Sequence, residues 1–392
     1  MQWFICLFLF LPLLSWAQNP LPGLLDEAWK ARATAHDIQL LYTQIDRSAE
    51  DGLRLTTYRW GADSSTYFYP ASSVKLPVAI LALQHLNELG VEGLSPHSFL
   101  FHGPAPAAAP SPAVASDTSS RTGLPSAAHY IRKLLLTSDN DAYNRLFEVL
   151  GPSYINSALA QIGIEDTRLI HRVGVGGFTP ETHQWLNPIR YTNGYETLYQ
   201  IGPRRDTFYR ALTQVQGQLR GQGYTTDDGT LVEQPFDFRR KNYLSLSALH
   251  GILARVVLPE AFPPEQRFEL TPADYELLRD AMGQRPRESD YPRYDKPDNY
   301  VKFWVYGDQD DATRIPDPIR IYNKVGWAYG YLTDVAYIVD ERAGVEFLLS
   351  GTIHVNENQI YNDGVYEYDE VGLPFFGEVG RLLLDYERGR GN

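Results

Sequence analysis

The chain has 392 residues, of which 43% are hydrophobic and 21% are charged, and this balance is typical of a folded protein rather than of a disordered one. Its length fits one large domain or two of ordinary size. The formal net charge of −13 disfavours binding to a nucleic-acid backbone or to an anionic membrane surface.

Residues 1–17 form an uncharged, apolar segment that ends in the letters SWA. The segment is shorter than the roughly 20 residues that span a bilayer, and its end has the small-x-small pattern of a cleavage site. We therefore expect a signal peptide over 1–17, a mature protein over 18–392 and a periplasmic or secreted location. The alternative is an uncleaved N-terminal anchor. The only cysteine, Cys6, lies in this segment, so the mature chain would contain no disulfide and no thiol nucleophile.

The pattern of apolar residues predicts one helix and two strands before a second, buried helix. An amphipathic helix is expected over 22–34, and strands over 38–45 and 53–60 follow it. Residues 73–89 are apolar on nearly every side of a helix, which is typical of a helix in the middle of a domain. Pro77 falls in its first turn, where the missing N–H costs little.

The middle of the chain is predicted to contain several helices and, between them, long irregular segments that are interpreted as loop insertions. Helices are expected over 127–136, from about 140 to Gly151-Pro152, over 244–257, and after Thr271 as an N-cap. Loop insertions are expected over 103–126, about 203–241 and 286–318, with a hairpin turn at Asp227-Asp228-Gly229 in the second of them.

The C-terminal part returns to strands, over 321–325, 331–339 and 345–353, and closes with a helix over 375–386. Because strands stand near both ends and helices between them, the two ends are expected to pair into one sheet while the middle forms a helical lobe. The predicted fold class is therefore α/β, a sheet with flanking helices plus a helical lobe in one composite unit.

Three short motifs follow one another along the chain, and each of them alone is a weak signal. They are the S-x-x-K run Ser72-Ser73-Val74-Lys75, the S-D-N run Ser138-Asp139-Asn140, and Lys324-Val325-Gly326, which is similar to K-T-G. Together, in this order and setting, they resemble the signature of class A β-lactamases and penicillin-binding proteins. Over roughly 36–390 the sequence resembles a class A β-lactamase-like serine hydrolase of the penicillin-recognising superfamily.

The chemistry of nucleophilic catalysis also explains why a serine and a lysine would occupy the first motif. Ser72 stands where a loop becomes a buried helix, and the positive end of the helix dipole favours a developing alkoxide. Lys75 lies three residues on, hence on the same face and one turn away. A lysine held in an apolar site has a lowered pKa and can take a proton from a hydroxyl.

The resemblance implies a β-lactamase/transpeptidase-like antiparallel sheet and a role for each motif residue. Ser138 would relay a proton to the leaving nitrogen, and Lys324 would supply a positive charge to that relay and to a substrate carboxylate. Asn140 would hydrogen-bond the amide side chain of the substrate. The backbone N–H groups of Ser72 and Trp327 would form an oxyanion hole, where one donor is worth roughly 3 kcal/mol of barrier.

The third motif departs from the family at Val325, where the family has Thr or Ser. Loss of that hydroxyl removes a hydrogen bond worth roughly 1.5–3 kcal/mol to a charged substrate group. Gly326 and Trp327 are still expected at the substrate, and the indole of Trp327 is expected to crowd the site. Recognition of a β-lactam carboxylate is thus the weakest part of the resemblance.

A second departure concerns the group that releases the acyl intermediate. The family carries a Glu in an E-x-x-L-N loop, and the matching stretch here is ETHQWLN over 181–187. Aligning its last two residues places His183 at the position of the base, with Glu181 two residues earlier. Histidine is a competent base near neutral pH. The base is therefore Glu181, His183 or neither, and in the last case the acyl-enzyme turns over slowly.

The nine histidines show no metal-ligand spacing, so no metal site is expected, and no other cofactor is expected. No G-x-S-x-G elbow is present, which argues against an α/β-hydrolase. The leading hypothesis is an exported, monomeric serine hydrolase that acylates at Ser72 and opens β-lactam rings. One alternative is a D-alanyl-D-alanine carboxypeptidase or transpeptidase. Another is a weakly active protein that binds β-lactams or peptidoglycan fragments. None of these has a nucleic-acid partner or keeps a membrane span after signal cleavage.

Overall fold

The computed structural model describes residues 19–48, 52–106 and 111–390. The expected signal peptide over 1–17, with Cys6, lies outside these residues. None of the helices in the described ranges combines the length and the apolar character that a membrane crossing requires.

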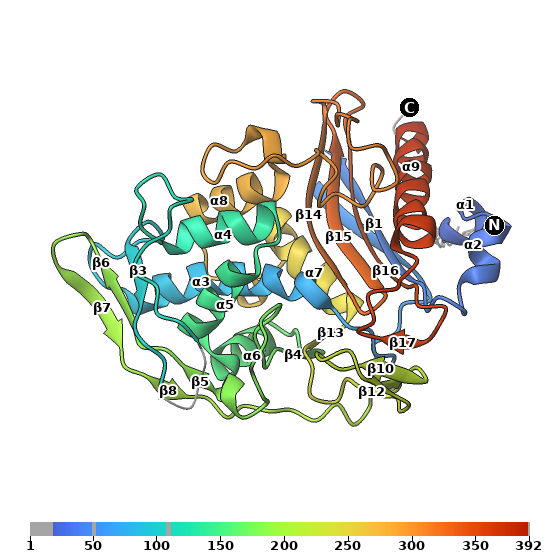
Figure 1. Cartoon of the computed structure of the whole chain (residues 1–392). Helices are drawn as coiled ribbons and strands as arrows, with labels where there is room; N and C mark the ends of the chain where they lie inside the picture. Colours follow the sequence, from blue (N-terminus) through green and yellow to red (C-terminus); the bar gives the residue numbers. More distant parts are fainter. Residues whose placement is uncertain (1–18, 49–51, 107–110, 391–392) are drawn as a thin grey trace, which may run out of the picture.

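Strands from both ends of the chain form one antiparallel, five-stranded sheet in the order β14-β15-β16-β1-β2 (Figure 1). The strands are β1 (Gln39–Ser48), β2 (Gly52–Trp60), β14 (Ile319–Ala328), β15 (Tyr331–Asp340) and β16 (Val345–His354). The junction of the two ends is the pairing of β1 with β16, in which Leu41 lies opposite Ser350. The predicted sheet class is thereby confirmed, and β14, which carries the third motif, is an edge strand.

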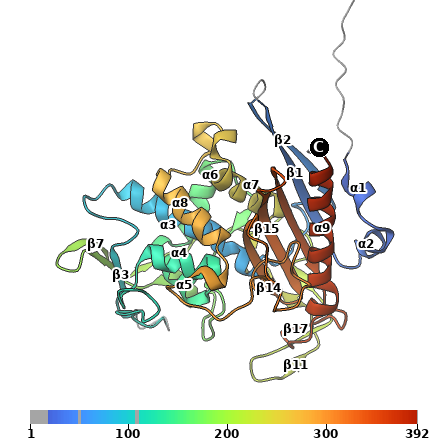
Figure 2. The same ribbon diagram turned by 90° about the horizontal axis from the view of Figure 1, so that it is seen from above.

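Helix α9 (Leu373–Arg390) covers one face of this sheet, and α7 (Leu246–Val257) contacts the other face (Figures 1 and 2). The helix expected over 22–34 is divided into α1 (Leu21–Leu24) and α2 (Glu27–Arg32). The division occurs because the Asp26 side chain accepts a hydrogen bond from the backbone of Trp29 and so caps a new helix. Trp29 then packs edge-on against Phe375, with ring centroids 5.2 Å apart.

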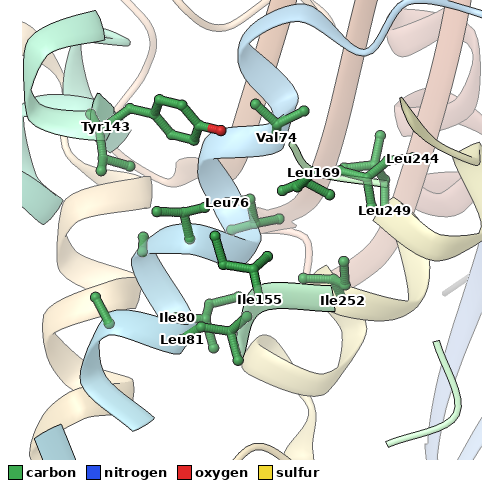
Figure 3. Packing of buried hydrophobic residues seen from close by; sticks show 14 of the residues in the cluster. Val74, Leu76, Ile80, Leu81, Tyr143, Ile155, Leu169, Leu244, Leu249 and Ile252 are labelled. Atoms are coloured by element: carbon green, nitrogen blue, oxygen red, sulfur yellow. The ribbon is translucent and has the colours of Figure 1, made fainter. Parts of the chain in front are cut away.

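A helical lobe lies beside the sheet, on the side away from α9 (Figure 1). It contains α3 (Lys75–Leu89), α4 (Ala127–Leu136), α5 (Asn140–Leu150), α6 (Pro152–Gln161) and α8 (Pro272–Gly283). The 3-10 turn η1 (Ala71–Val74) leads into α3, which is buried on nearly every side. Figure 3 shows Leu76, Ile80 and Leu81 of this helix among side chains of the surrounding elements. Because each such side chain contributes roughly 1.5–3 kcal/mol on burial, the start of α3 is firmly held.

Two predicted helix ends in the lobe were confirmed, but one of them hid a further helix. Thr271 caps α8 as expected, in a capping box with Asp274. Gly151, with φ of 79°, ends α5 as expected, but Pro152 then opens α6, a helix that the sequence pattern did not reveal. Proline suits the first turn of a helix, where its missing N–H would have no partner in any case.

Short strands and turns account for most of the remaining chain. They are β3 (Phe99–His102), β4 (Thr167–Arg168), β5 (Trp185–Leu186), β6 (Ile189–Thr192), β7 (Thr197–Ile201), β8 (Arg204–Arg205), β9 (Leu219–Arg220), β10 (Gly223–Thr225), β11 (Leu231–Val232), β12 (Phe236–Asp237), β13 (Tyr243–Leu244) and β17 (Ile360–Tyr361). The 3-10 and π turns are η2 (Thr182–Gln184), η3 (Pro259–Ala261), η4 (Pro264–Gln266), η5 (Pro286–Glu288) and η6 (Tyr368–Gly372).

The segment 203–241 is built of such short strands, and its predicted hairpin joins β10 to β11. Its Phe236 and Phe238 rings lie 5.0 and 5.8 Å from the ring of Tyr329, which stands in the turn between β14 and β15. This expected insertion therefore packs against the strand end that follows the third motif.

Candidate active site

Ser72 lies in the η1 turn, directly before α3 and beside β14. The preceding residue, Ala71, has a φ of 46°, a conformation that a residue other than glycine rarely adopts. The neighbouring Ser73 is fully buried and donates a hydrogen bond to the Pro70 carbonyl at 2.6 Å. Ser72 is only partly buried, and its hydroxyl makes no hydrogen bond within the described part of the chain. Of the two serines, Ser72 is thus the one that is accessible to a substrate.

The Lys75 ammonium is buried and joins the first two motifs. Its Nζ donates to Ser138 Oγ at 3.2 Å, to Asn140 Oδ1 at 2.6 Å and to the Ser138 carbonyl. Burial lowers the pKa of Lys75 to about 7, while the charge of Asp139 acts in the opposite direction. Near neutral pH the side chain is therefore present both as an ammonium and as a neutral amine that can accept a proton.

Ser138 lies between two lysines. Lys324 Nζ donates to Ser138 Oγ at 2.9 Å and to the Val325 carbonyl at 2.7 Å. Burial and the nearby Lys75 hold the pKa of Lys324 well below its ordinary value. Ser138 itself has a φ of 60°. The fold therefore brings the predicted residues Lys75, Ser138, Asn140 and Lys324 into one continuous hydrogen-bonded group.

Gly326 allows β14 to approach the nucleophile turn. A Cβ atom at this position would lie 2.9 Å from the Ser72 nitrogen and 2.7 Å from the Ser73 nitrogen, and it would also collide with the Pro70 carbonyl oxygen. These neighbours are backbone atoms, which cannot rotate away. Any residue larger than glycine must therefore push the strand and the turn apart.

We predict that Gly326→Ala lowers the rate of acylation at Ser72 by at least about a hundredfold, because displacements near 1 Å in a catalytic group have effects of this size. It should also destabilise the fold by about 1–3 kcal/mol through overpacking. The measurements are the acylation rate and urea unfolding. Gly389→Ala is the control, since among the described residues its added Cβ meets no atom within 4 Å apart from its chain neighbours and its own helix backbone. Acylation unchanged in Gly326→Ala would contradict the proposed close approach.

The side chains of β14 divide between its two faces. Lys324 and Gly326 face the nucleophile turn, whereas Val325 is buried in the cluster under α9. The Trp327 ring packs near Phe303 at 5.7 Å, on the same side as Val325. The expectation that its indole crowds the site is therefore corrected, because alternation along the strand turns the ring away. The edge position of β14 leaves alternate backbone N–H groups outside the sheet ladder.

A buried polar network lies behind Lys324, and sequence reasoning missed it. Lys302 Nζ donates to Asn323 Oδ1 at 2.7 Å, and Asn323 Nδ2 donates to Asp334 Oδ1 at 2.8 Å. Burial raises the pKa of Asp334 to about 6 and lowers that of Lys302 to about 7. The charge of Asp334 favours the protonated form of Lys324. The available signal was the single carboxylate within the otherwise uncharged strand 331–339.

The two candidate bases lie in the loop that follows β4. The His183 ring stacks on Phe178 with centroids 4.8 Å apart, and its Nδ1 accepts a hydrogen bond from the Arg172 backbone at 3.3 Å. Burial, then the neighbouring His171 and Arg172, lower the pKa of His183 to about 2. Glu181 is exposed and lies 3.9 Å from Arg240. The lowered pKa makes the His183 imidazole a poor proton acceptor near neutral pH, and the Glu181 carboxylate lies exposed beside a guanidinium.

Within the described ranges no three metal-binding side chains gather in a way that could hold an ion.

A serine at the start of a buried helix, a second serine held between two buried lysines, and an edge strand pressed against both define a penicillin-recognising serine enzyme. A sequence model described as "Beta-lactamase enzyme family" matches residues 53–386. The chain belongs to this β-lactamase enzyme family.

Three of the solved structures that are similar to the chain are β-lactamases. One from Burkholderia ambifaria has 15% sequence identity and a TM-score of 0.49, with 92% of this chain and 98% of that chain covered. One from Burkholderia vietnamiensis has 11% identity and a TM-score of 0.49, with 94% and 96% covered. The β-lactamase from Streptomyces albus G has 15% identity and a TM-score of 0.46, with 93% and 97% covered. No curated protein matches the sequence.

Proposed function

We propose that this serine enzyme forms a covalent acyl-enzyme at Ser72 with β-lactams, as class A β-lactamases do. The observation that carries the proposal is the continuous chain of hydrogen bonds from Lys75 through Ser138 to Lys324. A serine hydroxyl needs a base to activate it, and the leaving nitrogen needs an acid to protonate it. This chain of hydrogen bonds supplies both a proton acceptor and a proton donor. The expected signal peptide over 1–17 supports export to the periplasm or beyond the cell.

In the proposed step, the Ser72 oxygen attacks the lactam carbonyl while the neutral Lys75 amine takes its proton. The new C–O bond forms, the C–N bond of the ring breaks, and the ring nitrogen takes a proton from Ser138. Ser138 regains a proton from the Lys75 ammonium, so the protons balance. Lys324 Nζ, which donates a hydrogen bond to Ser138 Oγ, stabilises the Ser138 oxygen during this transfer.

The expected slow release of the acyl group from Ser72 favours a second candidate function. Slow deacylation is supported by the surroundings of the two candidate bases, because Glu181 is exposed beside Arg240 and burial lowers the pKa of His183. Slow release would make the protein a D-alanyl-D-alanine peptidase-like or transpeptidase-like enzyme, or a receptor for β-lactams and peptidoglycan fragments, rather than an efficient β-lactamase. Incubation of the mature protein with a reporter penicillin, followed by intact mass and a hydrolysis assay, separates these functions. Rapid hydrolysis without a trapped adduct supports the β-lactamase, and a long-lived adduct supports slow release.

We predict that Glu181→Gln and His183→Gln each change the rate of deacylation by less than about threefold, since a true general base contributes about 10²–10⁴-fold. The measurement is decay of the Ser72 adduct after removal of excess penicillin. A hundredfold loss in either variant would identify that residue as the base and restore the efficient β-lactamase. Glu181→Gln keeps the size of the side chain, whereas His183→Gln also removes the ring that stacks on Phe178, so thermal unfolding of both variants is the control for loop packing.

A further inference from the structure

A cavity of about 570 Å³ lies beside the nucleophile turn. Its wall includes Tyr69, three residues before Ser72, and Tyr329 in the turn after β14. Gly174 forms another part of the wall, and a Cβ atom added there would strike the Asn140 side chain. The cavity therefore borders the active site on the side where Asn140, the expected contact for the substrate's amide side chain, is located.

Lys241 is a cation in this cavity that lacks a carboxylate partner. Two arginines of the wall do have one: Arg172 donates to Glu148 at 2.9 Å, and Arg240 lies 3.9 Å from Glu181. Across the described ranges, by contrast, the Lys241 ammonium makes neither a hydrogen bond nor an ion pair. It is thus free to pair with a charge that a ligand brings.

The Lys241 backbone is firmly anchored. Its N–H donates to the Phe238 carbonyl at 3.0 Å, and its carbonyl accepts from Arg168 Nη2 at 2.9 Å. The ammonium lies 5.7 Å from the centre of the Phe236 ring and 6.0 Å from that of Tyr329. Cation–π contacts hold a lysine without consuming its hydrogen-bond donors. A side chain positioned in this way loses little further freedom when a ligand binds.

Three carboxylates also line the cavity, and two are already engaged. Asp206 accepts from the Ser153 backbone at 2.8 Å, and Asp237 pairs with Arg239 at 2.7 Å. The third, Asp227, is exposed. Burial lowers the pKa of Lys241 and the charge of Asp227 raises it, so a bound anion would offset the loss of hydration. The half-buried charge in this cavity that has no partner among the described residues is therefore positive.

We infer that Lys241 receives a carboxylate at the far end of the substrate's acyl group. The inference rests on the acyl transfer proposed for Ser72, and it makes Lys241 a specificity-determining residue rather than a catalytic one. The ligand class is an acyl side chain that ends in a carboxylate several bonds beyond its amide. The described insertion 203–241 would then serve to place this cation beside the site.

The test compares glutaryl-7-aminocephalosporanic acid with its analogue in which the side-chain carboxylate is a primary amide. The two compounds differ in one charge. The second-order rate of Ser72 acylation is measured for both in the mature protein and in Lys241→Met, Lys241→Arg and Lys30→Met. Lys30→Met removes a lysine of α2, which lies outside the cavity. Dissociation constants of both compounds are measured by calorimetry in Ser72→Ala and in Ser72→Ala/Lys241→Met, where no acylation intervenes.

We expect the preference for the carboxylate to fall at least about tenfold in Lys241→Met, as loss of a charged hydrogen bond implies, and to persist in Lys241→Arg and Lys30→Met. Equal losses on both compounds, or an unchanged preference, overturn the inference. If Ser72 is never acylated but Ser72→Ala still prefers the carboxylate through Lys241, the acyl-transfer function fails and the carboxylate site stands. If acylation occurs without this preference, only the carboxylate site fails.

Discussion

Ser72→Ala should abolish the adduct with a reporter penicillin and lower kcat/KM for β-lactam hydrolysis by about 10⁴-fold or more, the scale of removing a nucleophile from a serine hydrolase. The expectation follows from the accessible hydroxyl at the start of α3 and from the amine of Lys75 one turn away. Since the Ser72 hydroxyl makes no hydrogen bond in the described chain, the free energy of unfolding should change by less than about 1 kcal/mol. Intact mass and thermal unfolding measure the two effects.

Ser73→Ala is the matched control, because it removes the same atom from the adjacent residue. The Ser73 hydroxyl is buried and bonds to the Pro70 carbonyl, so its loss should cost about 1 kcal/mol of stability while acylation persists. The two serines thus have opposite expected profiles. An adduct that forms in Ser72→Ala and disappears in Ser73→Ala would move the nucleophile to Ser73.

The parts of the site that could be predicted from sequence are those encoded over one turn or one strand. The S-x-x-K spacing placed Lys75 on the face of Ser72, and the all-round apolar run predicted the burial that lowers the pKa of Lys75. Strand patterns at both ends of the chain predicted the sheet. The long β-rich segments stand at these two ends with helices between them, so they were expected to pair with one another.

What could not be predicted depends on contacts between distant segments. The pairing of Val325 with Asp334 sets the register of β14 on β15 and buries Asp334 near Lys302, and no local pattern encodes it. The face on which the Trp327 ring lies also follows from that register. Likewise, Lys241 and Asn140 are about a hundred residues apart in the sequence, and only the fold shows that one cavity connects their surroundings.

The pH dependence of acylation should report Lys75. With a pKa lowered to about 7, the amine is mostly protonated below this pH and mostly neutral above it. Because only the neutral amine can accept the Ser72 proton, the acylation rate should rise about tenfold per unit below pH 7 and level off above it. Stopped-flow measurement of the acylation rate between about pH 5 and pH 9 records this rising limb of the pH–rate profile; the range lies between the ordinary pKa values of a carboxylic acid and of lysine.

Two variants determine whether that limb belongs to Lys75. Lys75→Arg keeps the positive charge but cannot lose its proton, so acylation should fall by about 10²–10⁴-fold and the limb near pH 7 should vanish. Asp139→Asn removes the carboxylate that raises the pKa of Lys75, so the limb should move to lower pH, while asparagine still caps α5. A limb that survives in Lys75→Arg, or that moves upward in Asp139→Asn, would assign the proton acceptor to another group. The downward movement is the sharper result, because a change in folding alone would alter the rate and not the pH at which it rises.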